Sequence, residues 1–125
     1  MKTTGTLTRT LIVDDSAAFR RCIQAFLESE SEIEVVGEAT SGMEAIVKAR
    51  ELKPDLVLMD MRMPGMDGIS AARQLREEMP ELKIIVMTSV DIQEYRDAAM
   101  ANGASGFVVK ESVVDTLLPT IRDVC

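Results

Sequence analysis

Polar side chains with distinct chemistry end or follow four of the apolar runs in this sequence. Asp14 and Asp15 come directly after "TLIV", Asp60 follows "LVLM", Thr88 ends "KIIVMT", and Lys110 follows "GFVV". Three carboxylates held close together repel one another unless a cation lies among them, and Mg²⁺ is usually bound by one or two carboxylates, water and a phosphate. A lysine and a hydroxyl complement the oxygens of a phosphoryl group, and an aspartate can take that group as a nucleophile. If these residues meet, the sequence predicts Mg²⁺-dependent phosphoryl transfer onto a carboxylate.

Each of these residues, taken alone, also has a purely structural explanation. The acids after the first run and the hydroxyls Thr88 and Ser89 after the fourth are good caps for following helices. Asp60 precedes a Pro-Gly turn, and Lys110 alone suits a solvated surface position. Caps and surface residues need not gather at one end of one sheet, so the functional interpretation depends on whether the fold brings them together.

Short apolar runs alternate with helical patterns along the chain. Continuous apolar runs are typical of strands buried on both faces, and their alternation with helices indicates an α/β fold with a covered parallel sheet. The expected strands are 10–14, 34–39, 56–59, 83–88 and 106–109, and the helices between and after them are expected to begin near Ser16, Ser41, Asp67, Asp91 and Ser112. The carboxyl ends of parallel strands meet at one edge, where such folds bind ligands. The sequence therefore predicts that the acids, the hydroxyl and the lysine share that edge.

Local signals refine these helices. Ser41 and Glu44 have the spacing of a capping box, and Asp91 with Glu94 is expected to cap the helix after the fourth strand. Cys22 falls on the apolar stripe of the first helix, so we expect it to be a small core residue.

Composition limits the classes of protein to which this chain can belong. A length of 125 residues and a hydrophobic fraction of 46% suit one folded domain. The net charge of -7 argues against a general nucleic-acid surface, and no apolar stretch has the length of a membrane helix. Two cysteines far apart predict neither a disulfide framework nor a metal site, and the lack of histidine excludes zinc-hydrolase and Ser-His chemistry. We expect a cytoplasmic protein that does not bind a membrane.

Four segments together resemble the receiver domain of two-component response regulators. They are "IVDDS", "DLVLMDMRMPGMDG", "VMTS" and "GFVVK", in that order, and the likeness extends from about Thr10 to Val124. The resemblance implies a flavodoxin-like (βα)5 fold, a doubly wound five-stranded parallel sheet with strand order 2-1-3-4-5. It also implies a single receiver domain over 1–125, with its core at about 10–124 and no output domain in this chain.

The resemblance assigns the acids a common task. Asp60 is expected to accept a phosphoryl group from the phosphohistidine of a sensor histidine kinase. Asp15 would bind Mg²⁺ directly, Asp14 would assist through water, and the backbone carbonyl of Arg62 would complete the metal site together with Asp60. Such a receiver catalyses its own phosphorylation and dephosphorylation and is not an enzyme acting on a separate substrate.

The resemblance also implies how the signal leaves the site. Thr88, followed by the small residue Ser89, would bond a phosphate oxygen, and Lys110 would pair with the phosphate or its acceptor. Phe107 has the position of a switch aromatic that turns inward when Thr88 moves. The expected output surface is made by the helix after Thr88, the fifth strand and the last helix.

One position departs from the family pattern. The lysine is often followed by a proline joined through a cis peptide bond, whereas here Glu111 follows Lys110. A cis bond costs a non-proline residue about 3 kcal/mol, so we expect a trans bond. Receivers with "GFVVKES" in place of a Lys-Pro pair are often attached to a helix-turn-helix DNA-binding domain. The resemblance therefore implies transcriptional output and a homodimer formed on phosphorylation, while this domain itself would not bind nucleic acid.

Other classes of protein fit these motifs less well. A phosphatase of the haloacid dehalogenase type needs a second acid where Arg62 stands, and a flavodoxin-like cofactor binder needs a phosphate loop where "DDSAAF" would repel an anion. A P-loop nucleotide-binding protein needs a Walker A motif, which the sequence lacks. The strongest alternative is a pseudo-receiver that binds proteins without being phosphorylated, and a phosphorylation assay with and without Mg²⁺ distinguishes it.

Overall fold

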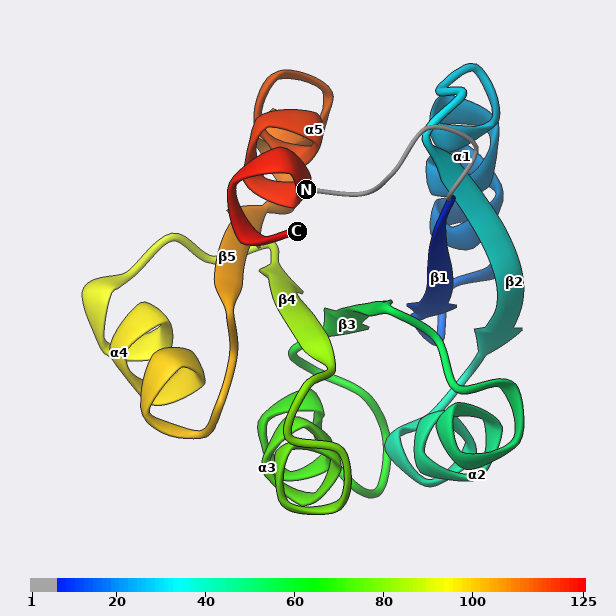
Figure 1. Ribbon diagram of the computed structural model, residues 1–125. Helices are drawn as coiled ribbons and strands as arrows, with labels where there is room; N and C mark the ends of the chain where they lie inside the picture. Colours follow the sequence, from blue (N-terminus) through cyan, green and yellow to red (C-terminus); the bar gives the residue numbers. More distant parts are fainter. Residues whose placement is uncertain (1–6) are drawn as a thin grey trace.

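The computed structural model describes residues 7–125, which form a parallel sheet with helices on both faces (Figure 1). The strands are β1 (Thr8–Val13), β2 (Ile33–Ala39), β3 (Leu56–Asp60), β4 (Lys83–Thr88) and β5 (Gly106–Val109). The helices are α1 (Ala17–Glu28), α2 (Gly42–Leu52), α3 (Gly68–Glu78), α4 (Gln93–Ala101) and α5 (Val113–Val124), with a short 3-10 helix η1 (Lys110–Ser112) before α5. The strand order is β2-β1-β3-β4-β5, which confirms the predicted flavodoxin-like topology.

Two apolar clusters, one on each face of the sheet, hold the helices in place. Figure 1 shows α1 and α5 on one side of the sheet and α2, α3 and α4 on the other. The first cluster contains Leu27 of α1 and Leu117 of α5, and the second contains Ala45 of α2 and Leu75 of α3. All five residues of β3 are buried, which explains why its sequence shows no polar alternation.

The strand register explains why the predicted site residues gather at one edge. The last residue of β1 pairs with Met59, which directly precedes Asp60. On the other side, Thr88 pairs with Val109, and Lys110 follows directly. The residues that leave β1, β3, β4 and β5 are therefore level with one another at the carboxyl edge of the sheet.

Side-chain caps begin three helices where the sequence predicts them. Ser16 accepts a hydrogen bond from a backbone N–H in the first turn of α1, and Ser41 and Asp67 cap α2 and α3 in the same way. The capping box of α2 is displaced by one residue, because Glu44 accepts from the backbone N–H of Thr40 at 2.6 Å. This bond is the main reason that the pKa of Glu44 lies below its usual value.

The predicted cap of α4 is wrong, whereas α5 begins at Ser112 as predicted. Ile92 stands at the N-cap of α4, and no side chain in the described part of the chain caps this helix. Asp91 lies one position too early and pairs with Arg96 at 4.0 Å instead. Ser112 is at the N-cap of α5, but its hydroxyl donates to the carbonyl of Val109 and does not cap the helix. Both helices of the expected output surface thus begin without a side-chain cap from the described residues.

The prediction that Cys22 is a core residue is also wrong, because Cys22 is exposed. Ile23 and Leu27 are the buried residues of α1, and Phe19 and Phe26 pack against the same cluster while partly buried. The helix contacts the sheet through a face that is narrower than its apolar stripe in the sequence, and Cys22 lies outside that face.

Smaller features agree with expectation. The strand bounds differ from the predicted ones by at most a residue or two, so that Asp14 follows β1 and Asp60 is the last residue of β3. Every peptide bond in the described residues is trans, including the one between Lys110 and Glu111. Within residues 7–125, none of the helices is both long and apolar enough to cross a bilayer.

Candidate functional site

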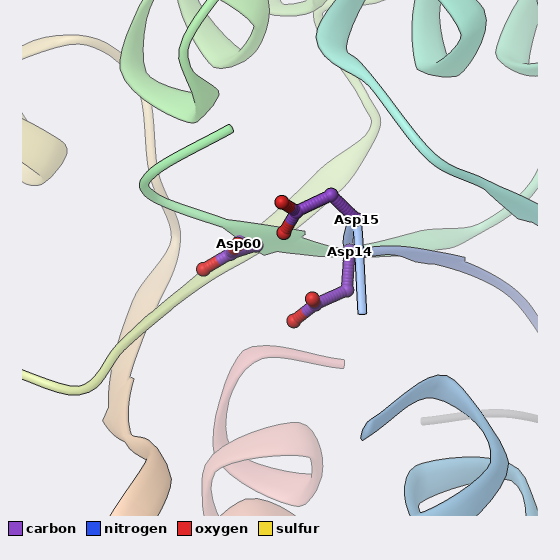
Figure 2. Close-up of side chains that lie close together, drawn as sticks. All are labelled: Asp14, Asp15 and Asp60. Carbon is purple, nitrogen blue, oxygen red and sulfur yellow. The ribbon is translucent and has the colours of Figure 1, made fainter. Parts of the chain in front are cut away.

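The three acids meet at the carboxyl edge of the sheet. Each offers a carboxylate oxygen, and these oxygens lie within 4.8 Å of one another. Figure 2 shows Asp14, Asp15 and Asp60 close together at the ends of β1 and β3. Asp14 and Asp60 are only 1% and 6% exposed, whereas Asp15 is exposed. Two carboxylates buried this close together are costly to keep ionised unless a cation compensates them.

Lys110 supplies a positive charge to this cluster. Its Nζ lies 2.6 Å from Oδ2 of Asp14 and 3.1 Å from Oδ1 of Asp60. The lysine reaches the acids from the start of η1, directly after β5, and its side chain is 18% exposed. The same Nζ lies 4.3 Å from the centre of the Phe19 ring in α1. Lys110 is therefore held by two acids and one aromatic ring.

Burial and charge shift the pKa values of Asp60 and Lys110. The pKa of Asp60 is raised, first because burial disfavours its ionised form and then because Asp14 is nearby, although Lys110 and the backbone N–H of Arg62 oppose the rise. Burial alone would lower the pKa of Lys110, but hydrogen bonds to Asp14 and Asp60 and their charges outweigh it and raise that pKa. Lys110 thus stays charged and favours ionised acids around it.

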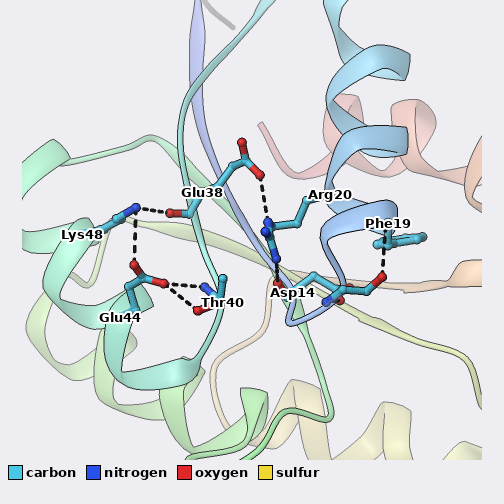
Figure 3. A network of polar contacts seen from close by, with 8 residues as sticks. Asp14, Phe19, Arg20, Glu38, Thr40, Glu44 and Lys48 are labelled. Carbon is cyan, nitrogen blue, oxygen red and sulfur yellow. Dashed lines mark hydrogen bonds and ion pairs between the residues drawn. The ribbon is translucent and has the colours of Figure 1, made fainter.

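The loop after β1 fixes Asp14 through both its side chain and its backbone. Its Oδ1 accepts a hydrogen bond from the N–H of Ser16 at 2.8 Å, which leaves Oδ2 for Lys110. Arg20 donates to the carbonyl of Asp14 at 2.7 Å and to Glu38 at 2.8 Å (Figure 3). Because Glu38 lies in β2, this network ties the loop to the edge of the sheet.

Two glycines shape the loop between β3 and α3. A Cβ on Gly68 would lie 2.0 Å from the carbonyl oxygen of Asp60, a separation that no side chain can occupy. The N–H of Gly68 donates to the carbonyl of Met61 at 3.0 Å. Gly65 has a φ of +78°, in the left-handed region that favours glycine. The segment "PGMDG" is therefore a turn that lets α3 begin against the backbone of Asp60.

Thr88 closes the site on the next strand. It is 2% exposed, and its Oγ1 accepts a hydrogen bond from the N–H of Val90 at 3.2 Å. Because this bond uses the hydroxyl as an acceptor, the hydroxyl hydrogen can still be donated to another group. Ser89, the next residue, is exposed. The loop after β4 is thus linked to the hydroxyl that the sequence assigns to phosphate.

Aromatic and basic side chains meet beside the site, between β5 and α4. The ring of Phe107 is only 8% exposed, within the cluster on the α2–α3–α4 face, and the guanidinium of Arg96 lies 4.6 Å from its centre. Arg62, in the loop after β3, stacks on Tyr95 of α4 at 5.2 Å and donates to its hydroxyl. Phe107 is thus more buried than a half-buried strand aromatic, and α4 contacts both the site loop and β5.

A cavity of about 810 Å³ lies at the opposite edge of the sheet, away from this chemistry. Its lining includes Pro54 and Leu82, which precede β3 and β4, together with Cys125 and the Arg50–Glu78 ion pair. The predicted site residues do not line it. The candidate site is therefore identified by its charged groups rather than by cavity size.

The structure brings Asp14, Asp15, Asp60 and Lys110 into one cluster and places Thr88 at the same edge. Sequence reasoning missed the Phe19–Lys110 contact and the bond from Arg20 to Asp14. Arg20 carried a local signal, since it lies one helical turn after the cap of α1. The contact of Phe19 with Lys110 joins opposite ends of the chain, and no local pattern predicts it.

Comparison with known proteins agrees with the fold. The response regulator protein VraR of Staphylococcus aureus is 40% identical over 116 residues, which are 91% of this chain and 54% of VraR. The chain thus spans about half the length of the curated relatives that it matches.

Solved structures show the same architecture. A two-component response regulator of the LuxR family from Aurantimonas has a TM-score of 0.91 at 32% identity, covering 95% of this chain and 85% of that one. A chain of the CheX–CheY–BeF3–Mg²⁺ complex of Borrelia burgdorferi has a TM-score of 0.90 at 27% identity, covering 97% of this chain and 91% of that one. The sequence model of the response regulator receiver domain matches residues 10–122. The chain belongs to the response regulator receiver domain family.

Proposed function

We propose that Asp60 is the phosphoacceptor of this receiver domain in two-component signalling. The observation that carries the proposal is a buried aspartate at the end of β3 with the Nζ of Lys110 3.1 Å from its Oδ1. Two further acids stand beside it, and the family of the chain supports the same role. A pseudo-receiver has no need of this complete set of acids, lysine and hydroxyl at one edge, so the phosphoacceptor function is favoured.

The proposed reaction transfers a phosphoryl group in one displacement. A carboxylate oxygen of Asp60 forms a bond to phosphorus, and the phosphorus–nitrogen bond of a phosphohistidine breaks. The electron pair of that bond leaves with the imidazole, which is neutral when it holds one proton. In dephosphorylation, the oxygen of water bonds to phosphorus and the bond to Asp60 breaks, which releases inorganic phosphate. The ammonium of Lys110 offsets the negative charge of the phosphoryl oxygens in both directions.

The acids fit a magnesium ion. Three carboxylates converge while a single ammonium contacts two of them, so the cluster keeps an excess of negative charge that suits a divalent cation with oxygen ligands. Asp15 and Asp60 would hold the ion directly with the backbone carbonyl of Arg62, and Asp14 would act through water. When bound, the ion supplies charge neutralisation to the transferring phosphoryl group. The presence of Mg²⁺ in the complex containing the related Borrelia chain supports this assignment.

The proposed switch begins at Thr88 and ends at Phe107. The hydroxyl of Thr88 would donate to a phosphate oxygen, which would draw the loop after β4 toward Asp60. Because the Phe107 ring is already buried at 8% exposure, phosphorylation would stabilise this inward placement rather than create it. Phosphorylation would then shift the surface made by α4, β5 and α5 toward one of two conformations.

The partners follow from this role. A sensor histidine kinase would supply the phosphoryl group, which places the domain in the cytoplasm. VraR is about twice as long as the matched region, so we propose that residues 1–125 are one receiver domain that acts on a DNA-binding output domain. Regulation of transcription is the output, and phosphorylation would favour a homodimer through the switching face. The net charge of -7 fits a domain that does not itself bind DNA.

Labelling with a small phosphodonor tests the proposal. With acetyl phosphate and Mg²⁺, we expect one phosphoryl group on Asp60, detected by mass spectrometry of the intact protein and its peptides. Asp60→Asn should lose the label, and leaving out Mg²⁺ should abolish it in the unmodified chain. Asp91→Asn, which changes an exposed aspartate beyond β4, is the matched control and should be labelled normally. Equal labelling of Asp60→Asn would contradict the assignment.

A further inference from the structure

The aromatic ring of Phe19 is an unassigned part of the lysine site. The Nζ of Lys110 lies 4.3 Å from the centre of this ring, within the range of a cation–π interaction. The same Nζ lies 2.6 Å from Asp14 and 3.1 Å from Asp60, so the ring and two acids share one ammonium. We propose that Phe19 is a positioning residue for Lys110, which holds the ammonium in the bridge between Asp14 and Asp60 that phosphoryl transfer requires.

The position of the ring is fixed by the start of α1. The backbone N–H of Phe19 donates to the Oγ of Ser16, the N-cap residue, at 3.2 Å. The Phe19 side chain is partly buried against the cluster that α1 and α5 share. Because Asp14 is bonded to the backbone of Ser16, the acid and the ring belong to one short segment. Asp14 and the Phe19 ring therefore contact Lys110 from the same short segment.

A lysine needs such a contact because its side chain is long and flexible. The ammonium could bridge the acids or extend toward solvent, and its side chain is still 18% exposed. The negative face of an aromatic ring attracts an ammonium, most strongly where water is excluded, and favours the bridging position over the extended one. A leucine of similar reach would fill the space without this attraction. Phe19 thus acts through Lys110 and is not itself expected to touch the phosphoryl group.

Packing alone is the competing explanation for Phe19, and a graded series of rings separates the two. Replacing Phe19 by phenylalanines with one, two and three ring fluorines weakens the cation–π attraction stepwise while keeping the shape of the ring nearly constant. Phe19→Leu removes the attraction completely. Phe26→Leu is the matched control, because Phe26 packs partly buried against the same cluster but lies about 10 Å further along α1.

The inference rests on the proposed function, so the experiment measures two quantities. The first is the rate at which acetyl phosphate with Mg²⁺ labels Asp60. We expect the rate to fall with each fluorine and to be about threefold to tenfold lower in Phe19→Leu, as the loss of one cation–π contact predicts. Phe26→Leu should keep the rate of the unmodified chain.

The second quantity is the NMR shift of the ε-protons of Lys110 in the unphosphorylated protein without metal. A ring facing the ammonium moves these protons upfield, and we expect that shift to be lost in Phe19→Leu and kept in Phe26→Leu. The positioning role would be overturned if the labelling rate does not change with fluorination, or if the ε-protons of Lys110 show no upfield shift from the ring. If Phe19→Leu does not fold, the fluorinated series alone decides. Failure of the unmodified chain to be labelled would instead contradict the phosphoacceptor assignment, and the NMR shift would still test the contact.

Discussion

Helices α3 and α4 follow the two strands that end in Asp60 and Thr88, yet they are held in very different ways. Asp67 caps α3, which buries a set of small and apolar residues, among them Gly68, Ala71, Ala72 and Leu75. No cap from the described residues begins α4, and Ala99 is the residue that it buries. Helix α3 is therefore part of the core, whereas α4 lies on the surface of that core.

The two helices are nevertheless joined at one end. Arg76 of α3 donates from Nε and Nη2 to the carbonyl of Gly103, directly after α4, at 3.1 and 2.9 Å. The end of α4 is thus tied to α3, while its start depends on contacts such as Arg62 with Tyr95. A helix that is tied to α3 at its end but begins without a side-chain cap from the described residues suits a switch, because elements that move are those with low local stability.

The largest effect that the comparison predicts comes from truncating one residue in each helix. Leu75→Ala leaves a cavity in the core and should lower the free energy of unfolding by about 3 kcal/mol. Met100→Ala, at a side chain that is 47% exposed, should lower it by less than about 0.5 kcal/mol. Urea unfolding followed by circular dichroism measures both. Equal losses would show that α4 is as much a part of the core as α3.

Strand β3, which leads into α3, ends in the buried carboxylate of Asp60. Removing this charge should change the free energy of unfolding by less than the cavity left by Leu75→Ala. The pKa of Asp60 is raised by burial and by Asp14, so the folded protein binds a proton more tightly there than the unfolded chain does. Stability contributed by this proton is present in acid and is lost as the pH rises from the ordinary value of 3.8 through the raised pKa. Asp60→Asn should therefore gain stability relative to the unmodified protein over that range.

Urea unfolding between acid and neutral pH, without Mg²⁺, checks this prediction. The difference between Asp60→Asn and the unmodified protein should grow with pH and then become constant. Asp123→Asn, the same substitution at an exposed position of α5, is measured beside it as the matched control. A difference that shrinks as the pH rises would mean that Lys110 outweighs burial at Asp60.

The smallest effects concern the helix starts. Asp67→Ala removes the bond to the N–H of Ser70 and should cost about 1 kcal/mol. Ile92→Asp places a capping residue at the extended N-cap of α4 and should add about 0.5 kcal/mol. Thermal unfolding measures both, and hydrogen exchange shows whether the first turn of α4 becomes slower to open. If Ile92→Asp slows that opening, the difference between the two helices depends partly on the cap.

The parts of the molecule that local chemistry determines could be predicted from the sequence. Ser16, Ser41 and Asp67 each begin a helix because their side chains accept a bond within that same helix. Asp60 and Lys110 could be placed at one edge because every strand in a parallel sheet has the same direction. Neither inference needs the details of packing.

The features that were missed depend on how elements pack. Cys22 is exposed because the width of the buried face of α1 is set by the sheet beneath it. The N-cap of α4 is Ile92 rather than Asp91, and the N–H of Val90, in the loop before it, donates to the hydroxyl of Thr88. Prediction from the sequence therefore worked for the acids of the site and failed for features that depend on packing between elements.

The contact between Asp14 and Lys110 joins residues that are 96 positions apart in the chain. A ribosome adds about 5 to 20 residues per second, so the lysine is made roughly 5 to 20 seconds after its partner acid. During that interval the nascent chain holds its acids without the ammonium that bridges them. The domain therefore gains a complete charged cluster only after β5 is synthesised and docks on β4. Within this domain, the lysine of the cluster is therefore among the later residues to be made.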